Sequence, residues 1–240
     1  MKRTLLGLLA LWFGFLSAQA DAAPPAEWRI SQSEGRVLLR ASGGQEPARV
    51  GRVLPAGGAL VTGPGARAEL LAGAGLWRVG AMAVWQATPG GARVLSGSAL
   101  VAVPSGAESA VEALGGRVHL GEGTWMLTAV DNEGLKLVCL ANAGTLRLAA
   151  EDVADKTAKQ QILRGGELVF LRPGGLGFSP VVTVFLAELL GTSRLVRGFP
   201  DPLPNLKILQ QAASVQSDRI AGVSNALVAG AQDASGFQLL

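Results

Sequence analysis

Two residues stand out chemically, because each is the only one of its type in the chain: His119 and Cys139. Imidazole and thiolate are both zinc ligands, but a zinc site needs three or four protein ligands at suitable spacing, and these two lie twenty residues apart. His119 shares a strand face with Arg117, which favours a solvated imidazole. Cys139 shares its face with Leu135 and Leu137, which predicts a buried, unreactive thiol. We therefore expect no metal site.

Hydrolytic chemistry is also disfavoured. Ser179 comes closest to a nucleophile elbow, but the closing glycine and the preceding buried strand of that motif are missing. No glycine-rich loop has the pattern of a phosphate- or dinucleotide-binding motif. Several carboxylates lie near turns without the pairing that a glycosidase needs: Glu108, Glu112, Glu122, Asp131 and Glu133. We expect no catalytic residues, no cofactor and no enzymatic activity.

The tryptophans are the remaining candidates for ligand contacts. Trp77 shares a strand face with Val79, and Trp125 with Leu127, as core residues do. Trp85 shares its face only with small alanines, so it is the best candidate for an exposed ring. An exposed indole stacks on sugars or anchors a protein partner, and we therefore place Trp85 on the predicted binding surface.

The first twenty residues predict export. Lys2 and Arg3 precede an apolar core from Leu5 to Leu16 and a small-residue site that ends at Ala20, which is the pattern of a cleavable signal peptide. No later apolar run is long enough for a transmembrane helix. After cleavage, 19 basic residues face 18 acidic ones without a basic cluster, so nucleic acid is not expected as a partner. The expected location is the periplasm or the extracellular space.

The elements between Trp28 and Leu171 are predicted to be β-strands. The chain has 33 glycines in 240 residues, about twice the usual ~7%, and they separate short apolar runs. This pattern gives about a dozen short strands, the first spanning Trp28 to Arg40, joined by connections too short for crossover helices. The expected fold is mainly β, either an antiparallel β-sandwich or a short β-solenoid, with a C-terminal helical appendage.

The pattern becomes helical after Pro173. Ser179 and Pro180 suit the start of a helix that Gly191 ends, and a second helix is predicted from Asn205 to Ala231. Four apolar residues lie near one face of that second helix: Leu209, Ile220, Val223 and Leu227. This face either packs on the β domain or docks a partner, so these four residues join Trp85 as the candidate partner surface. The predicted organisation is a signal peptide over 1–20, a β domain over 27–173 and a helical region over 178–240.

The β domain also resembles a known family. Val61, Thr62 and Gly63 are followed by Gly65, Ala68 and Leu70, and then by Arg78 and Gly80. In this order and spacing the residues resemble the periplasmic domain of the FecR family, the bacterial ferric-citrate regulators. Weaker matches at Leu95 to Gly106, Val118 to Met126 and Gly166 to Leu168 extend the resemblance over roughly Ser33 to Pro173.

Regulators of that family carry a cytoplasmic segment that controls a sigma factor, followed by a transmembrane helix. A predicted signal peptide stands in their place here, so the resemblance implies an exported domain for binding, sensing or scaffolding and no direct control of a sigma factor. We expect a binding or signal-relay module of the cell envelope, with an envelope protein as its partner. The alternative is a module that binds peptidoglycan or a surface glycan.

Overall fold

A computed structural model describes residues 27–231, with gaps at 73–74, 114–115, 131–133, 142, 149–159 and 176. Within the last helix, side chains are described as far as residue 221. The predicted signal peptide, Asp131 and Glu133 lie outside the described residues.

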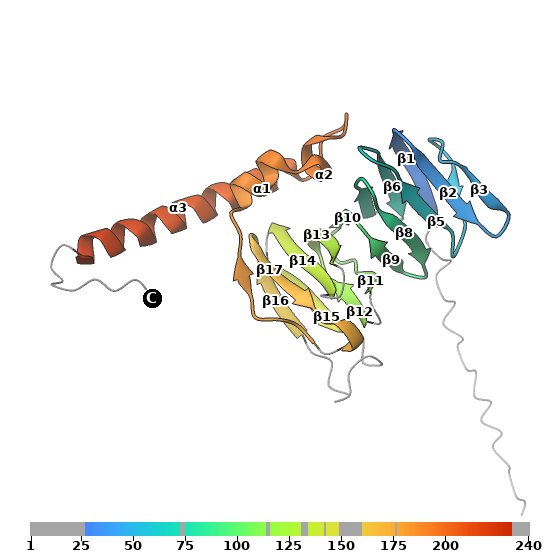
Figure 1. Cartoon of the computed structure of the whole chain (residues 1–240). Helices are drawn as coiled ribbons and strands as arrows, with labels where there is room; N and C mark the ends of the chain where they lie inside the picture. Colours follow the sequence, from blue (N-terminus) through green and yellow to red (C-terminus); the bar gives the residue numbers. More distant parts are fainter. Residues whose placement is uncertain are drawn as a thin grey trace, which may run out of the picture.

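The described chain is mainly β-strand, followed by helices (Figure 1). The strands are β1 (Trp28–Glu34), β2 (Val37–Ala41), β3 (Gly44–Pro47), β4 (Val53–Leu54), β5 (Ala59–Thr62), β6 (Arg67–Ala72), β7 (Gly75–Val79), β8 (Val84–Thr88), β9 (Gly91–Ser96), β10 (Ser98–Val103), β11 (Ser109–Ala113), β12 (Gly116–Leu120), β13 (Gly123–Val130), β14 (Gly134–Ala141), β15 (Ala143–Leu148), β16 (Gln160–Arg164), β17 (Glu167–Leu171) and β18 (Val182–Thr183). A 3₁₀ turn, η2 (Pro173–Gly175), precedes β18, and the helices are α1 (Leu186–Thr192), α2 (Arg194–Arg197) and α3 (Leu206–Ala231).

The described strands form two sheets of nine strands each. Sheet A has the order β18-β17-β14-β13-β10-β7-β6-β1-β4, and sheet B has the order β16-β15-β12-β11-β9-β8-β5-β2-β3. The chain passes between the sheets after one or two strands and advances along both in sequence order, except that β4 lies outside β1 and β3 lies outside β2. Among the described strands every pairing is antiparallel except that of β9 with β11. The two sheets enclose one apolar cluster, so the fold is a sandwich, and the mainly β prediction is confirmed.

The predicted single strand from Trp28 to Arg40 is wrong. Gly35, at φ +74°, ends β1, and the chain crosses to sheet B to begin β2. A Cβ on Gly35 would lie 3.0 Å from Ala66, so this crossing needs glycine for both conformation and space. This division accounts for one of the strands beyond the dozen expected. The polar strand β3, which ends at Pro47, was not predicted because edge strands carry little apolar pattern.

Three tryptophans lie in edge-to-face contact between the two sheets. The ring centroids of Trp28 and Trp85 are 4.6 Å apart, and those of Trp28 and Trp77 are 5.5 Å apart. Trp77 and Trp85 complete the triangle at 5.7 Å. Trp28 and Trp77 come from sheet A and Trp85 from sheet B, so the rings join the two layers.

The helical region covers the outer face of sheet A. Leu186, Leu190 and Leu209 pack with Val138 and Leu140 of β14 in a second apolar cluster. The predicted helix start at Ser179 is wrong, because this segment pairs with β17 and α1 begins only at Leu186. The Ser179 hydroxyl accepts a hydrogen bond from the Phe170 backbone N–H at 2.9 Å instead of capping a helix. The helix predicted over Asn205 to Ala231 is confirmed as α3.

A buried arginine of sheet A, Arg78, forms an ion pair within the sheet and hydrogen bonds to the helical region. The Arg78 side chain is 0% exposed and donates from Nε to Glu69 Oε2 at 2.8 Å. It also donates to three backbone carbonyl oxygens beyond α1, those of Leu195, Val196 and Asp201, at 3.2, 3.0 and 2.5 Å. Its guanidinium carbon lies 4.4 Å from the centre of the Phe199 ring. Asn205 adds a side-chain hydrogen bond to Thr124 of β13.

Candidate functional site

Two members of the predicted partner surface are buried, which corrects the prediction. Trp85 is 0% exposed, because Trp28 and Trp77 occupy the space that the small alanines of its own strand leave open. Leu209 is also 0% exposed and packs against sheet A. Neither side chain is available to a partner.

The other predicted members lie further along α3. Ile220 is half-buried, and the side chains of Val223 and Leu227 lie outside the described residues. Figure 1 shows α3 leaving the β domain and extending past it. The anchoring part of α3 ends near Gln216, whose amide accepts from the Leu186 backbone N–H at 2.8 Å and donates to the Val184 carbonyl oxygen at 2.9 Å. The open question about this helix is therefore settled for its first half, which packs on the β domain.

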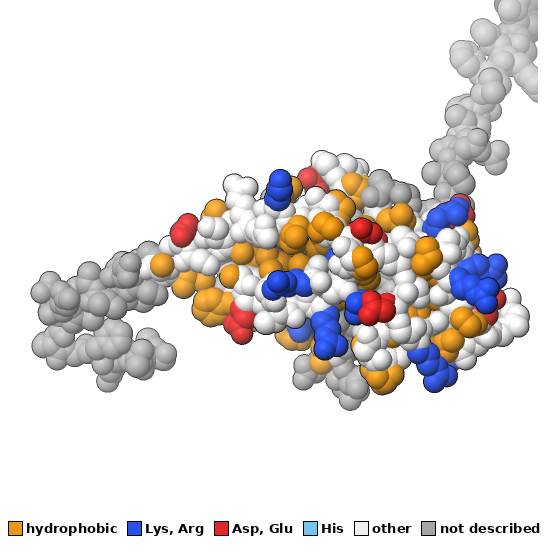
Figure 2. All heavy atoms as spheres, turned by 90° about the horizontal axis from the view of Figure 1, so that it is seen from above, with side chains coloured by type: hydrophobic (Ala, Val, Ile, Leu, Met, Phe, Trp, Pro, Cys, Tyr) orange, Lys and Arg blue, Asp and Glu red, His pale blue; other side chains and the backbone are white. Residues whose placement is uncertain are grey.

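A different face of α3 carries exposed apolar side chains. Ile208 is 45% exposed and Val215 is 61% exposed, and they line a groove of about 380 Å³ between α3 and the β16–β17 turn. We call this the α3 groove. Arg164 and Arg219 line it as well, and neither guanidinium has an ion-pair partner among the described residues. In Figure 2, hydrophobic side chains gather along the helical region on the face shown.

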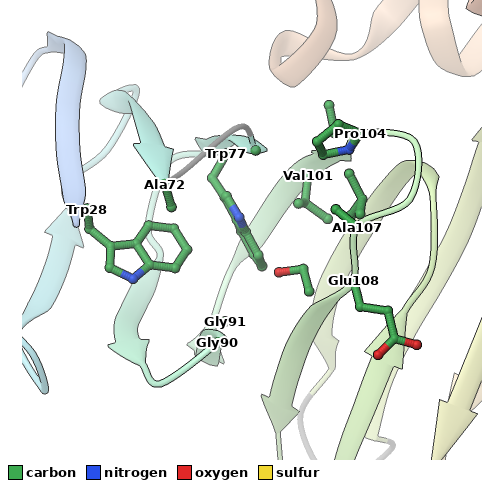
Figure 3. A pocket seen from close by; sticks show the side chains of 13 residues that line it. Trp28, Ala72, Trp77, Gly90, Gly91, Val101, Pro104, Ala107 and Glu108 are labelled. Atoms are coloured by element: carbon green, nitrogen blue, oxygen red, sulfur yellow. The ribbon is translucent and has the colours of Figure 1, made fainter. Parts of the chain in front are cut away.

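The second candidate is a pocket at the edge of the sandwich, where the β6–β7 and β8–β9 hairpins meet the β10–β11 loop (Figure 3). We call it the tryptophan pocket. It encloses about 240 Å³, and its wall includes the rings of Trp28 and Trp77. In Figure 3, Val101 and Ala107 lie across the pocket from the two rings. The wall is mostly apolar, and Ser109 contributes a hydroxyl group.

Close backbone packing beside this pocket depends on glycine. Gly91 lies on β9 where that strand pairs in parallel with β11, opposite Ala110. A Cβ on Gly91 would lie 1.8 Å from the Ala110 carbonyl oxygen, so no larger residue fits. Gly91 therefore allows β9 and β11 to lie close together where they border the pocket.

The charged group at the pocket mouth is engaged outside it. Glu108 Oε2 accepts from Arg147 at 2.8 Å and lies 3.6 Å from His119 Nδ1. Figure 3 shows the Glu108 carboxylate directed away from the tryptophans. Burial lowers the pKa of His119 below its ordinary value, Glu108 opposes this shift, and Arg147 and Arg117 add to it. The interior of the pocket is therefore electrically neutral.

Cys139 lies in the core, as predicted. It is 0% exposed, and burial raises its pKa to about 11. A thiol of this kind is protonated at neutral pH and is neither a nucleophile nor a metal ligand. Within the described residues, no three His, Cys, Asp or Glu side chains gather as a metal site. Among the described helices, α3 included, none combines the length and hydrophobicity that a membrane span requires.

Sequence reasoning missed the Arg78–Glu69 pair, although the β6–β7 hairpin register places the two residues opposite each other.

The described residues of the FecR-like motif have structural roles. The Thr62 hydroxyl donates to the Gly80 carbonyl oxygen at 2.6 Å and accepts from the Ala83 N–H at 2.8 Å, which joins β5 to the chain after β7. Compared with protein-family models and with curated proteins, the chain has no match.

Proposed function

We propose that this chain is an exported, FecR-like, non-enzymatic binding module that relays a signal in the bacterial cell envelope by docking a protein partner in the α3 groove. Export rests on the predicted signal peptide, and the FecR-like character rests on the ordered motifs of the β domain. The observation that carries the proposal is the pair of exposed side chains Ile208 and Val215 beside two arginines, Arg164 and Arg219, that have no ion-pair partner in the described part of the chain.

The chemistry of the groove defines the partner. An apolar floor flanked by two positive charges fits a segment with an apolar face and acidic side chains at its edges. Arg164 and Arg219 supply the positive flanks, while Ile208 and Val215 supply the floor. We therefore propose an acidic amphipathic segment of an envelope protein as the occupant.

The attachment of α3 supports a relay role. The segment that enters α3 carries the Asp201 carbonyl oxygen, which accepts from Arg78 at the middle of sheet A. The Asp201 carboxylate also accepts from Gln32 of β1 at 2.7 Å. A load on α3 is therefore transmitted directly to two strands of the sheet.

No observation favours the glycan alternative. The four described tryptophans are at most 5% exposed, so none of them presents a flat ring face on the surface on which a polysaccharide chain could stack. Because Trp85 is buried, the main reason for the glycan-binding hypothesis no longer holds.

A photo-crosslinking amino acid at Gln211, on the rim of the groove, tests the proposal in intact cells. We expect it to capture an envelope protein whose crosslinked peptide is acidic and amphipathic. Val215→Glu and Arg219→Glu abolish the crosslink and weaken binding of the purified partner at least tenfold. Leu95→Glu is the matched control, because Leu95 is 53% exposed on β9, away from the groove.

Two results contradict the proposal. Capture that persists unchanged in Val215→Glu and Arg219→Glu rules out the groove as the docking site. Recovery of the full-length protein from the cytoplasm with residues 1–20 still attached rules out export.

A further inference from the structure

We propose that the tryptophan pocket binds a small neutral ligand that consists of one ring and one hydrogen-bonding group, such as a phenol. This binding site is separate from the α3 groove and does not depend on the docking of a protein partner.

The size of the pocket limits the ligand to one ring. The enclosed volume is about 240 Å³. A protein cavity of roughly 150 Å³ accepts benzene, so this pocket has room for a six-membered ring with one or two substituents. A two-ring ligand with side groups needs one of the larger pockets that are common for cofactors.

The wall is rigid before any ligand arrives. Trp28 and Trp77 lie edge-to-face at 5.5 Å, and Trp85 supports both rings from sheet B. Because each ring is packed against the other two, the surface that a ligand meets is already ordered. Binding therefore loses little side-chain entropy.

The charge distribution excludes ions. Among the described residues of the pocket wall, Glu108 is the one titratable residue, and its carboxylate is directed away from the tryptophans (Figure 3). It pairs outside the pocket with Arg147 and His119. An anion meets no positive group inside, and a cation meets no free carboxylate. Either ion would lose its hydration without compensation, so the ligand is neutral.

Polar groups in the wall favour a ligand with one hydrogen-bonding substituent. The Ser109 hydroxyl lines the pocket and has no hydrogen-bond partner among the described residues. The Trp77 indole N–H likewise has no acceptor within the described part of the chain. A hydroxyl group on the ring provides both the donor and the acceptor that these two groups lack.

Titration of the full mature chain with 4-methylphenol and with toluene tests this assignment by calorimetry and by saturation-transfer NMR. We expect both molecules to bind saturably at one site and to raise Tm. Ser109→Ala weakens 4-methylphenol by roughly threefold to tenfold, the value of one neutral hydrogen bond, and leaves toluene within about twofold.

Ala107→Phe fills the pocket from its loop side and reduces the affinity for both molecules at least tenfold. Ala56→Phe is the control, because Ala56 lines a separate cavity of about 230 Å³ that shares only Trp28 with the tryptophan pocket. Ala72→Leu fills the same pocket from the end of β6 and replaces Ala107→Phe if that variant does not fold.

Three outcomes overturn the proposal. One is that neither molecule saturates the chain up to its solubility limit. Another is that both pocket-filling variants bind as the unmodified chain does. The third is that Ala56→Phe loses as much affinity as they do, which places the ligand elsewhere.

Discussion

Replacing Arg78 by methionine tests whether the buried ion pair holds the helical region against sheet A. Methionine keeps much of the length of the side chain but has no charge and no donors. Glu69 is then left with a single described partner, the Ser31 hydroxyl, which donates to Glu69 Oε1 at 2.9 Å. Three carbonyl oxygens, those of Leu195, Val196 and Asp201, also lose their donor.

The structure sets the size of the effect. Both side chains are buried, Arg78 at 0% and Glu69 at 6% exposure, so water does not replace the lost partner. Removal of one member of such a pair costs about 3–5 kcal/mol of unfolding free energy. That is a large share of the ~5–15 kcal/mol that stabilises a typical domain. For a chain of this length it corresponds to a fall in Tm of about 6–20 °C.

The double variant separates the two contributions. Glu69→Leu combined with Arg78→Met removes both charges, so the cost of the unpaired carboxylate disappears. The three carbonyl oxygens remain without their donor, at about 1 kcal/mol each. We therefore expect the double variant to be more stable than Arg78→Met alone but less stable than the unmodified chain.

Urea unfolding measures these free energies, and hydrogen exchange locates the change. Exchange of the backbone N–H groups in residues 194–201 accelerates more than exchange in β14 if the helical region loosens first. Arg52→Met is the matched control, because Arg52 pairs with Glu46 at 2.6 Å and both side chains are more than half exposed. An exposed pair is worth at most about 1 kcal/mol. A loss in Arg78→Met no larger than in this control would refute the reasoning.

Three further predictions concern single residues. Cys139, with its pKa raised by burial to about 11, reacts with a thiol reagent at pH 8 only in urea, and labelling of the native chain contradicts this. Because burial lowers the pKa of His119, the unfolded chain binds that proton more readily, so stability falls as pH drops through about 6.5. NMR titration of the ring and a smaller pH dependence in His119→Gln check this sign. Gly91→Ala lowers the unfolding free energy by about 2 kcal/mol or more, whereas Gly43→Ala, with no atom within 4 Å of the added Cβ, changes it by at most about 0.5 kcal/mol.

Local patterns were sufficient for most of the strands and for α3. Alternating apolar residues and turn glycines mark the β-strands, and the spacing of apolar residues marks α3. The inward direction of Cys139, Trp77 and Trp125 also followed from alternation within one strand. These features depend on near neighbours in the sequence.

Features that depend on distant segments were not predictable in this way. Alternation placed Trp85 on a face with small alanines, but burial depends on Trp28 and Trp77 in the opposite sheet. Ser179 has the side chain of a helix cap, yet pairing with β17 decides its conformation. Because tertiary contacts outweigh a local preference at both positions, sequence pattern alone gave the wrong surface and the wrong helix start.

The Arg78–Glu69 pair lies between these two cases. The hairpin register places Glu69 and Arg78 opposite each other on β6 and β7. A solvent-exposed cross-strand ion pair has the same register, so the register alone does not predict that the pair is buried. Their burial comes from residues 195–201, more than a hundred positions later in the chain. An arginine between Trp77 and Val79 on a central strand is a sign that the outer face of the sheet is covered.

The cover and the sheet therefore form one cooperative unit. Without α1, α2 and the first half of α3, sheet A exposes Val138, Leu140 and Leu168 together with a buried ion pair. A β domain that ends at residue 173 lacks β18 of sheet A and also lacks the carbonyl oxygens that accept from Arg78. Within this first half of α3 the two faces differ: Leu209 and Ala213 are buried against the sheet, whereas Ile208 and Val215 are exposed and line the groove that we propose as the docking site.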